Sequence, residues 1–310
     1  MAAALAPLVA AVVFAGGARA SAPAASPGPL PVSYNFLANA IAYGYATNAP
    51  GANNWACKPS ARHPEPVVLV HGTGGDGANN WPTYSALLAD TGYCVFSLTY
   101  GLSPALAATH IPIGGMNSIE SSAAQLGAFI AQVRHATGAT KVDLLGHSQG
   151  TLMPDYYVKF LGGAPYVDKY VSLAPLWHGT YGNSAASELA TWSKMFGYSE
   201  TSLPVCAACG EMVSGSTFLT KMRAGGVAVK GVTYTNIITN HDELVVPYTS
   251  GIEPGMRNIV VQDACPLDLA EHLEIASDPI GAVDVLNALD PAHPRPVPCE
   301  LVLPAVGPLG

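Results

Sequence analysis

A pentapeptide of the form Gly-x-Ser-x-Gly lies between an apolar strand and a helix, and it constrains the fold more than any other feature of the chain. Residues 141–145 (KVDLL) read as a short buried strand, Gly-His-Ser-Gln-Gly follows at 146–150, and residues 152–161 have a helical pattern. A turn this tight imposes strained backbone angles on its serine and lifts the hydroxyl above the sheet. The spacing therefore predicts that Ser148 is a nucleophile.

The alternative is a glycine-rich turn with an incidental serine, since the chain has 32 glycines. The flanking strand and helix favour the nucleophile, because the start of a helix stabilises developing negative charge. Side chains at Gly146 and Gly150 would collide with neighbouring backbone, so we assign both to the elbow. His147 adjoins Ser148, but neighbours on such a turn point in different directions, and we expect His147 to pack beneath it rather than act as the base.

Short apolar runs alternate with helical patterns along the rest of the chain. The pattern predicts strands at 66–70, 93–98, 141–145, 170–173, 233–239 and 258–262, and helices at 81–88, 118–135, 152–161 and 279–289. Such alternation indicates a mostly parallel sheet with helices on both faces, and ligands bind at the carboxyl ends of its strands. Together with the elbow, it predicts an α/β-hydrolase fold with small cap insertions.

A second glycine-rich loop follows the first of these strands, in VLVHGTGG at 68–75. In the α/β-hydrolase fold, one donor of the oxyanion hole is the backbone N–H after the nucleophile, and the other comes from this loop. We therefore predict Gln149 and Thr73 as the donors. The alternative, a phosphate-binding loop, lacks the Gly-Lys-Ser/Thr ending. We expect His71 to buttress the loop.

The base of such a site must lie on a loop after the last strand, because the chain order in this fold is Ser, then Asp or Glu, then His. His272 fits, since it follows the last predicted strand and precedes the final helix. His178 and His241 come before that strand, and His293 lies in the tail. We predict that His272 accepts the serine proton and then donates it to the leaving alcohol.

The acid is expected where the preceding strand ends, and Asp242 is the first carboxylate after residues 233–239. Glu243 is its close rival, and Asp263 and Asp268 are more distant ones. A structural role for Asp242, as a carboxylate that caps a loop, also stays open. As the acid, it would hold the tautomer of the histidine and stabilise the imidazolium.

Five segments together resemble the class 2 lipases of actinobacteria, over roughly residues 60–290. They are VVLVHGTGG (67–75), NNWPTYSALLADTGY (79–93), GHSQGTLMPDYY (146–157), DELVVPY (242–248) and EHLEIASDP (271–279). The resemblance implies a secreted carboxylic-ester hydrolase that acts on acylglycerols or similar esters, with Ser148, Asp242 and His272 as its triad. The chain is also distantly similar to fungal lipase B enzymes, in which a Thr and the Gln after the serine form the oxyanion hole.

Two apolar, Gly/Ser-rich regions are candidates for the acyl pocket. They are residues 102–116 and 174–222, the second with Leu176, Trp177, Trp192, Met195 and Phe196. Insertions above the strand ends are typical cap positions, and both a mobile lid and an ordinary packed insertion are open. Acyl transfer to another alcohol is the alternative activity. A non-catalytic binding protein on the same scaffold is a third hypothesis, which an intact triad disfavours.

The composition limits the partners of the chain. Its net charge is -8 with 13 Lys and Arg, and no basic run appears, so nucleic-acid binding has no electrostatic basis. No carboxylate cluster has the spacing of a calcium loop, and the predicted chemistry needs neither a metal nor another cofactor. We infer a lipid or small ester as substrate and no obligate protein partner, and we leave transient contact with a lipid interface open.

The first twenty residues predict export. An apolar stretch at 3–15 leads to Ala18-Arg19-Ala20, a small-x-small site typical of signal-peptide cleavage before Ser21. No Lys or Arg precedes that stretch, so an upstream start codon and an uncleaved anchor at the cell envelope are open. The expected organisation is a signal peptide at 1–20, a leader and N-terminal extension at 21–60, a catalytic domain at 61–290 and a Pro-rich tail at 291–310.

An even number of cysteines agrees with export, because disulfides form in oxidising compartments. The CxxC at 206–209 could be a redox motif or half a zinc site, but no second CxxC or nearby His pair completes a zinc site. We therefore expect a short-loop disulfide there. Spacing alone does not fix how the other four cysteines pair, and the pairs we expect are Cys57–Cys94 and Cys265–Cys299 besides Cys206–Cys209.

Overall fold

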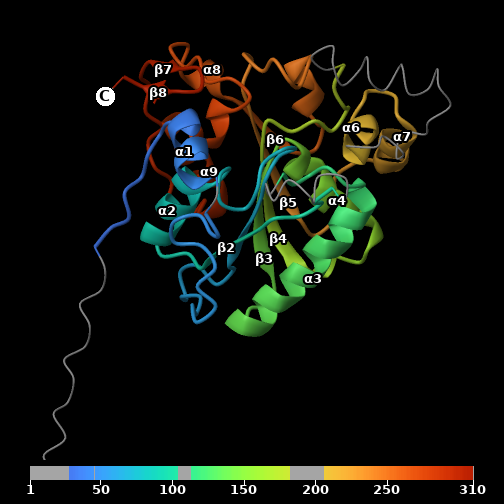
Figure 1. Cartoon of the computed structure of the whole chain (residues 1–310), viewed down its shortest axis with the longest axis horizontal. Coiled ribbons are helices and arrows are strands. Elements are labelled where there is room, and N and C mark those ends of the chain that lie inside the picture. The colour runs from blue at the N-terminus through green and yellow to red at the C-terminus, as the bar shows by residue number, and fades with distance from the viewer. Residues whose placement is uncertain (1–27, 45, 104–112, 182–205, 310) are drawn as a thin grey trace, which may run out of the picture.

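The central feature of the computed structural model, which describes residues 28–44, 46–103, 113–181 and 206–309, is a parallel sheet (Figure 1). Its six strands have the order β2-β1-β3-β4-β5-β6, and every neighbouring pair runs parallel. The strands are β1 Val67–Val70, β2 Val95–Leu98, β3 Val142–His147, β4 Val167–Leu173, β5 Thr233–Ile238 and β6 Arg257–Val260. A separate antiparallel pair near the C-terminus consists of β7 Val302–Leu303 and β8 Gly307–Pro308.

Helices connect these strands and cover both faces of the sheet. They are α1 Phe36–Tyr43, α2 Pro82–Asp90, α3 Ile119–Thr137, α4 Gln149–Phe160, α6 Ala207–Glu211, α7 Thr217–Arg223, α8 Val261–Ala264 and α9 Pro279–Leu289. Three short 3-10 helices are η2 Ala164–Tyr166, η4 Tyr248–Gly251 and η5 Glu274–Ala276. Among the residues described, none of the helices is both long enough and apolar enough to cross a bilayer.

The side chains of a buried strand alternate between the two faces, and β1 shows how this builds two cores. Val68 and Val70 pack in the core that α3 and α4 cover, whereas Val67 and Leu69 pack in the core beneath α2 and α9. Figure 1 shows these two helix pairs on opposite sides of the sheet. Because helices cover both faces of the sheet, all four β1 side chains are buried, as is typical of a parallel sheet.

The mostly parallel sheet with helices on both faces is confirmed, and it is parallel throughout its six strands. Most element boundaries differ from the prediction by one or two residues, and three differences are informative. Strand β4 begins at Val167 rather than at residue 170, and β6 ends at Val260, where the single turn of α8 begins. Helix α4 begins at Gln149 rather than at residue 152, because the chain enters the helix directly from the serine of the elbow.

All three predicted disulfides are present, which ties the segments around the sheet together. Cys57–Cys94 joins the N-terminal extension to the start of β2, and Cys265–Cys299 holds the Pro-rich tail. The third, Cys206–Cys209, joins the N-cap residue of α6 to a residue in its first turn. The predicted signal peptide at 1–20 lies outside the described residues.

Candidate active site

The serine of the elbow lies directly between β3 and α4, at the centre of the sheet. Its backbone angles, φ 55° and ψ −124°, fall in a region that residues with a side chain rarely adopt. The two glycines make this turn possible. A Cβ at Gly146 would lie 2.0 Å from the carbonyl oxygen of Gly150, and a Cβ at Gly150 would lie 2.0 Å from that of Val70. The strain and the close approach are those predicted for this pentapeptide.

Three side chains from distant segments form one hydrogen-bonded chain. His272 Nε2 lies 2.8 Å from Ser148 Oγ, and His272 Nδ1 lies 2.9 Å from Asp242 Oδ2. The imidazole and the carboxylate are almost completely buried, with side-chain exposures of 4% and 1%. The three residues follow β3, β5 and β6, so the carboxyl edge of the sheet brings them together, as the chain order predicts.

The charge on Asp242 governs the protonation of this histidine. Burial, the largest single influence, would lower the pKa of His272, and the neighbouring Asp242 carboxylate and its hydrogen bond to the ring oppose it. Glu243 and Glu271 add further negative charge, and the net result is a raised pKa. The ring is thereby a better proton acceptor than an isolated histidine.

The rival carboxylates and histidines have other contacts. Glu243 accepts a hydrogen bond from the backbone N–H of His272 (3.3 Å) rather than from its ring. Asp268 is fully buried and accepts from the N–H of Ala270. His178 and His293 each pair with another carboxylate, at 3.0 and 2.8 Å.

His147, next to the serine, is buried beneath the turn and contacts the His272 loop. Its Nε2–H donates to the carbonyl oxygen of His272 (2.8 Å), and its Nδ1 lies 3.1 Å from Asn80 Oδ1. The same Asn80 oxygen accepts from the N–H of Gly72 (3.0 Å). Burial lowers the pKa of His147 to about 3, so the ring is neutral. Asn80 thus lies beside the elbow and binds the loop after β1 through the N–H of Gly72, a contact that the residue pattern around it does not predict.

The two predicted oxyanion donors lie side by side at the head of the elbow. Thr73 Oγ1 donates to Gln149 Oε1 (2.8 Å), which locks the loop after β1 onto the start of α4. Gln149 is the first residue of α4, so its N–H has no partner within the helix. The amides on either side of Thr73 are occupied, because Gly72 donates to Asn80 and Gly74 to the carbonyl of Gly114.

His71 supports this loop from below, in the position expected of a structural histidine. Its Nδ1–H donates to the carbonyl oxygen of Gly72 (2.7 Å), and its Nε2 accepts from the N–H of Tyr100 (3.3 Å). The Tyr100 ring stacks on the imidazole at 4.2 Å between centroids. Burial lowers the pKa of His71 to about 4, so the neutral ring satisfies both contacts.

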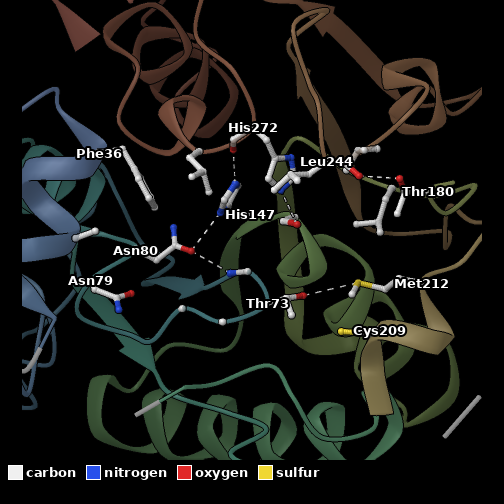
Figure 2. A pocket seen from close by; sticks show the side chains of 18 of the residues that line it. Phe36, Thr73, Asn79, Asn80, His147, Thr180, Cys209, Met212, Leu244 and His272 are labelled. Carbon is white, nitrogen blue, oxygen red and sulfur yellow. Dashed lines mark hydrogen bonds between the residues drawn. The ribbon is translucent and has the colours of Figure 1, made fainter. Parts of the chain in front are cut away.

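A pocket of about 480 Å³ opens above Ser148 and His272. Figure 2 shows Phe36 on one side of it and Cys209 and Met212 on the other. The first wall, named here the α1 wall, consists of Phe36, Ala40 and Leu273. The second, the α6 wall, consists of Leu176, Thr180, Cys209, Met212, Val213, Leu244 and Val245.

The predicted pocket regions agree only in part with these walls. Leu176 lines the pocket, but Trp177 does not, because its ring is fully buried in the core and its Nε1–H donates to Asn236 Oδ1 (3.1 Å). Of the region 102–116, the described residues support the Thr73 loop without lining the pocket. The predicted pocket residues Trp192, Met195 and Phe196 lie outside the described residues.

The α1 wall was missed altogether. Residues 36–43 (FLANAIAY) form an apolar helix within the segment assigned to the leader and N-terminal extension, and nothing local indicates what that helix covers. Its first N–H, that of Phe36, donates to Glu274 Oε2 (3.1 Å), which attaches the helix to the His272 loop. Within the described ranges, no group of three His, Cys, Asp or Glu side chains could hold a metal ion.

Comparison with solved structures identifies the fold. The chain is similar to Aspergillus fumigatus lipase B, with a TM-score of 0.58 and 19% identity over 81% of this chain and 57% of that one. It is also similar to a Bacillus licheniformis lipase in its mature form, with a TM-score of 0.47 and 18% identity over 65% of this chain and 84% of that one. The chain therefore spans little more than half the length of the Aspergillus enzyme. With the parallel sheet, the likeness to the Aspergillus enzyme confirms the α/β-hydrolase fold.

A family model gives the assignment at the level of the sequence. Residues 64–282 match the model described as Lipase (class 2), and this match covers well over half of the chain. It includes the loop after β1, the elbow, and the segments that carry Asp242 and His272. The chain belongs to the class 2 lipase family.

Proposed function

We propose that this protein is a serine hydrolase that cleaves carboxylic esters of lipids, with Ser148 as nucleophile, His272 as base and Asp242 as the supporting acid. The observation that carries the proposal is the continuous chain of hydrogen bonds, 2.8 and 2.9 Å long, that ends at Ser148 beneath an apolar pocket. Membership of a lipase family supports it.

In the first half of the reaction, Ser148 Oγ attacks the ester carbonyl while its proton moves to His272 Nε2. Asp242 stabilises the imidazolium that forms. The carbonyl oxygen becomes negatively charged and accepts hydrogen bonds from the N–H groups of Thr73 and Gln149, whose positions are held by the bond between their side chains. His272 then gives the proton to the leaving alcohol, and the acyl group remains on Ser148.

The second half repeats these steps with water in place of the serine. His272 takes a proton from the water, the resulting hydroxide attacks the acyl-enzyme, and the same two amides stabilise the oxyanion. The carboxylic acid then leaves as His272 returns the proton to Ser148. The histidine must be neutral at the start of each half.

The walls of the pocket favour an apolar substrate. Both the α1 wall and the α6 wall present aliphatic, aromatic or sulfur-containing side chains, with Thr180 as the one hydroxyl among them. A cavity of this size and character fits acyl chains or other apolar ester groups on either side of the serine. We therefore propose acylglycerols or similar lipid esters as substrates.

We also infer that the protein works outside the cytosol. Three disulfides join all six cysteines, and such bonds persist in oxidising compartments. The apolar stretch and the small-x-small site at residues 18–20 supply the proposed export signal.

The proposal is tested by replacing Ser148→Ala and measuring the hydrolysis of a soluble short-chain ester. We expect kcat to fall by roughly 10⁴-fold or more, because the nucleophile is lost. Ser121→Ala is the matched control, since Ser121 lies exposed on α3, and it should retain full activity. A Ser148→Ala protein that keeps more than a tenth of the wild-type rate would refute the proposal.

A further inference from the structure

The α6 wall contains one half of a disulfide, because Cys209 lines the pocket and is bonded to Cys206. Cys206 caps the start of α6, and its Sγ accepts from the N–H of Cys209 (3.2 Å). Cys209, Met212 and Val213 then face the pocket. Met212 Sδ lies 3.9 Å from Thr73 Oγ1, as Figure 2 shows, so the wall contacts the loop that carries a proposed oxyanion donor.

Helix α6 has only five residues, so its position depends on contacts with the rest of the chain. A helix this short is not stable by itself. The N–H of Ala207 donates to the carbonyl of Met116 (2.8 Å), and the carbonyl of Met212 accepts from the N–H of Thr180 (3.0 Å). The disulfide adds a covalent restraint across the first turn of α6, from Cys206 to Cys209, three residues before Met212.

This disulfide should affect the shape of the α6 wall more than the stability of the whole fold. Cys206 and Cys209 are three positions apart, against separations of 37 and 34 for the other pairs. A shorter loop restricts the unfolded chain less and so stabilises the fold less. Loss of the Cys206–Cys209 bond should therefore change the wall while leaving the fold intact.

We propose that the Cys206–Cys209 disulfide determines ester specificity. It holds Met212 against the Thr73 loop and so limits the bulk of the ester arm that lies along the α6 wall, and reduction by a small dithiol relaxes this limit. This inference rests on the proposed ester hydrolysis. It adds a specificity-determining element to the site, and one that a thiol reagent can switch.

The reduction is a two-electron exchange. One thiolate of the dithiol attacks Cys209 Sγ, which is half-buried and faces the pocket, and the Cys206–Cys209 bond breaks. Cys206 leaves as a thiolate and takes up a proton. The second thiol of the reagent then displaces Cys209, which is also protonated, and the reagent leaves as a cyclic disulfide.

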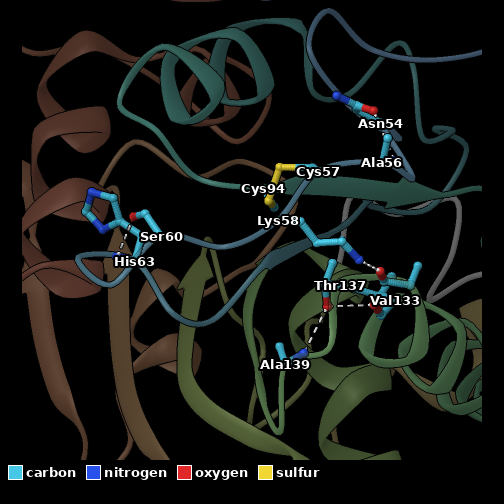
Figure 3. The surroundings of a disulfide bond; sticks show 11 residues. Asn54, Ala56, Cys57, Lys58, Ser60, His63, Cys94, Val133, Thr137 and Ala139 are labelled. Carbon is cyan, nitrogen blue, oxygen red and sulfur yellow. Dashed lines mark hydrogen bonds between the residues drawn. A yellow bond between two sulfur atoms is a disulfide. The ribbon is translucent and has the colours of Figure 1, made fainter.

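A matched control is provided by Cys57–Cys94, whose surroundings are shown in Figure 3. Neither cysteine lines the pocket, and Cys94 is 2% exposed at the start of β2. Loss of this pair removes a disulfide of the same chemistry away from the α6 wall. It should lower stability without changing which esters are preferred.

The test measures kcat/KM on two ester series. In one, the acyl group grows on a fixed alcohol, and in the other the alcohol grows on a fixed acetyl group. The proteins compared are the wild type, the wild type reduced by a dithiol, the Cys206→Ser/Cys209→Ser variant, Met212→Ala, and the Cys57→Ser/Cys94→Ser control. Alkylation and mass mapping of the reduced protein verify that only Cys206 and Cys209 are free.

We expect the bulky-to-small ratio of kcat/KM to rise about tenfold in one of the two series for the reduced protein, the double serine variant and Met212→Ala. The control should keep the wild-type ratio. An unchanged ratio, or equal changes in both series, overturns the inference while ester hydrolysis itself stands. If the double variant does not fold, the reduced protein and Met212→Ala decide the result. If the wild type hydrolyses neither series, the proposed function fails, and the inference fails with it.

Discussion

The elbow around Ser148 and the walls of the pocket above it are built in opposite ways. The elbow is made of consecutive residues, and two glycines at 146 and 150 leave the backbone one way to turn. Each wall is made of segments that are remote in sequence, such as α1 and the His272 loop, where the N–H of Phe36 donates to Glu274 across 238 positions. The elbow is thus rigid by local geometry, whereas the walls are held by tertiary contacts and a disulfide.

This difference implies that the elbow determines whether the reaction occurs, whereas the walls determine which ester is preferred. Changes at the elbow or its hydrogen-bonded partners should abolish folding or reaction, because the close packing there leaves these groups no room to move. Changes in the walls should alter which ester is preferred, because they reshape the space beside the reacting carbonyl without moving it. The four variants below probe this separation.

Gly150→Ala should have the largest effect. The added Cβ would lie 2.0 Å from the carbonyl oxygen of Val70, which belongs to the neighbouring strand β1. We expect a loss of roughly 5 kcal/mol or more, enough to prevent accumulation of folded protein. Circular dichroism and thermal melting check this. Gly28→Ala, where nothing lies within 4 Å of the new Cβ, is the control. A Gly150→Ala protein that melts near the wild-type temperature would show that the elbow is not as tight as described.

Asp242→Asn should leave the fold intact and lower kcat by about 10⁴-fold, because the histidine loses the partner that sets its tautomer. It should also change the pH profile. Burial lowers the pKa of His272, and the Asp242 carboxylate is the chief group that raises it. Wild-type kcat/KM therefore falls as the pH drops through that raised pKa. Without the charge, burial dominates, the pKa falls, and the acidic limb moves to lower pH. An acidic limb at the wild-type pH would show that Asp242 does not set the pKa of His272.

Phe36→Ala should affect binding alone. The side chain forms part of the α1 wall, so its loss should raise KM for esters with a large apolar group by about tenfold and leave kcat on acetate esters unchanged. Leu37→Ala is the matched control, because Leu37 is the next residue of α1, is 50% exposed and does not line the pocket. Equal effects of the two substitutions would mean that the helix acts on stability and not on the pocket.

Asn35→Ala should have the smallest effect. Asn35 caps α1 by accepting from the N–H of Ala38 (2.8 Å), and removal of such a cap costs about 1 kcal/mol. We expect the melting temperature to fall by roughly 2–4 °C, with kcat on a short ester unchanged. A fall in kcat would show that α1 affects the elbow, so that the pocket walls and the reacting groups would not be independent.

The parts of the site that depend on local geometry or chain order could be predicted from the sequence. Ser148 is marked by a glycine pattern between a strand and a helix, and Asp242 and His272 follow from the order in which strands deliver residues to one edge of a sheet. What these residues share is that a few positions define them. The expected disulfide pairs are also present, although spacing alone does not fix the pairing of six cysteines.

The walls could not be predicted in the same way, because apolar side chains do not reveal whether they face a cavity or a core. Trp177 was expected in the pocket, yet it lies in the core because Asn236 on β5 accepts its N–H. Phe36 belongs to a short apolar helix whose neighbours are decided by the packing of the whole chain. Asn80 lies beside His147 of the elbow and accepts from the N–H of Gly72 in the loop after β1, an arrangement that appears only when both segments are in place.

The most direct test of the central claim is covalent labelling with a serine-directed phosphonate ester, followed by mass mapping of the modified peptide. We expect one adduct per chain, on Ser148, at a rate that falls sharply in His272→Ala because the hydroxyl loses its base. Labelling elsewhere, or equal labelling of the wild type and Ser148→Ala, would contradict it.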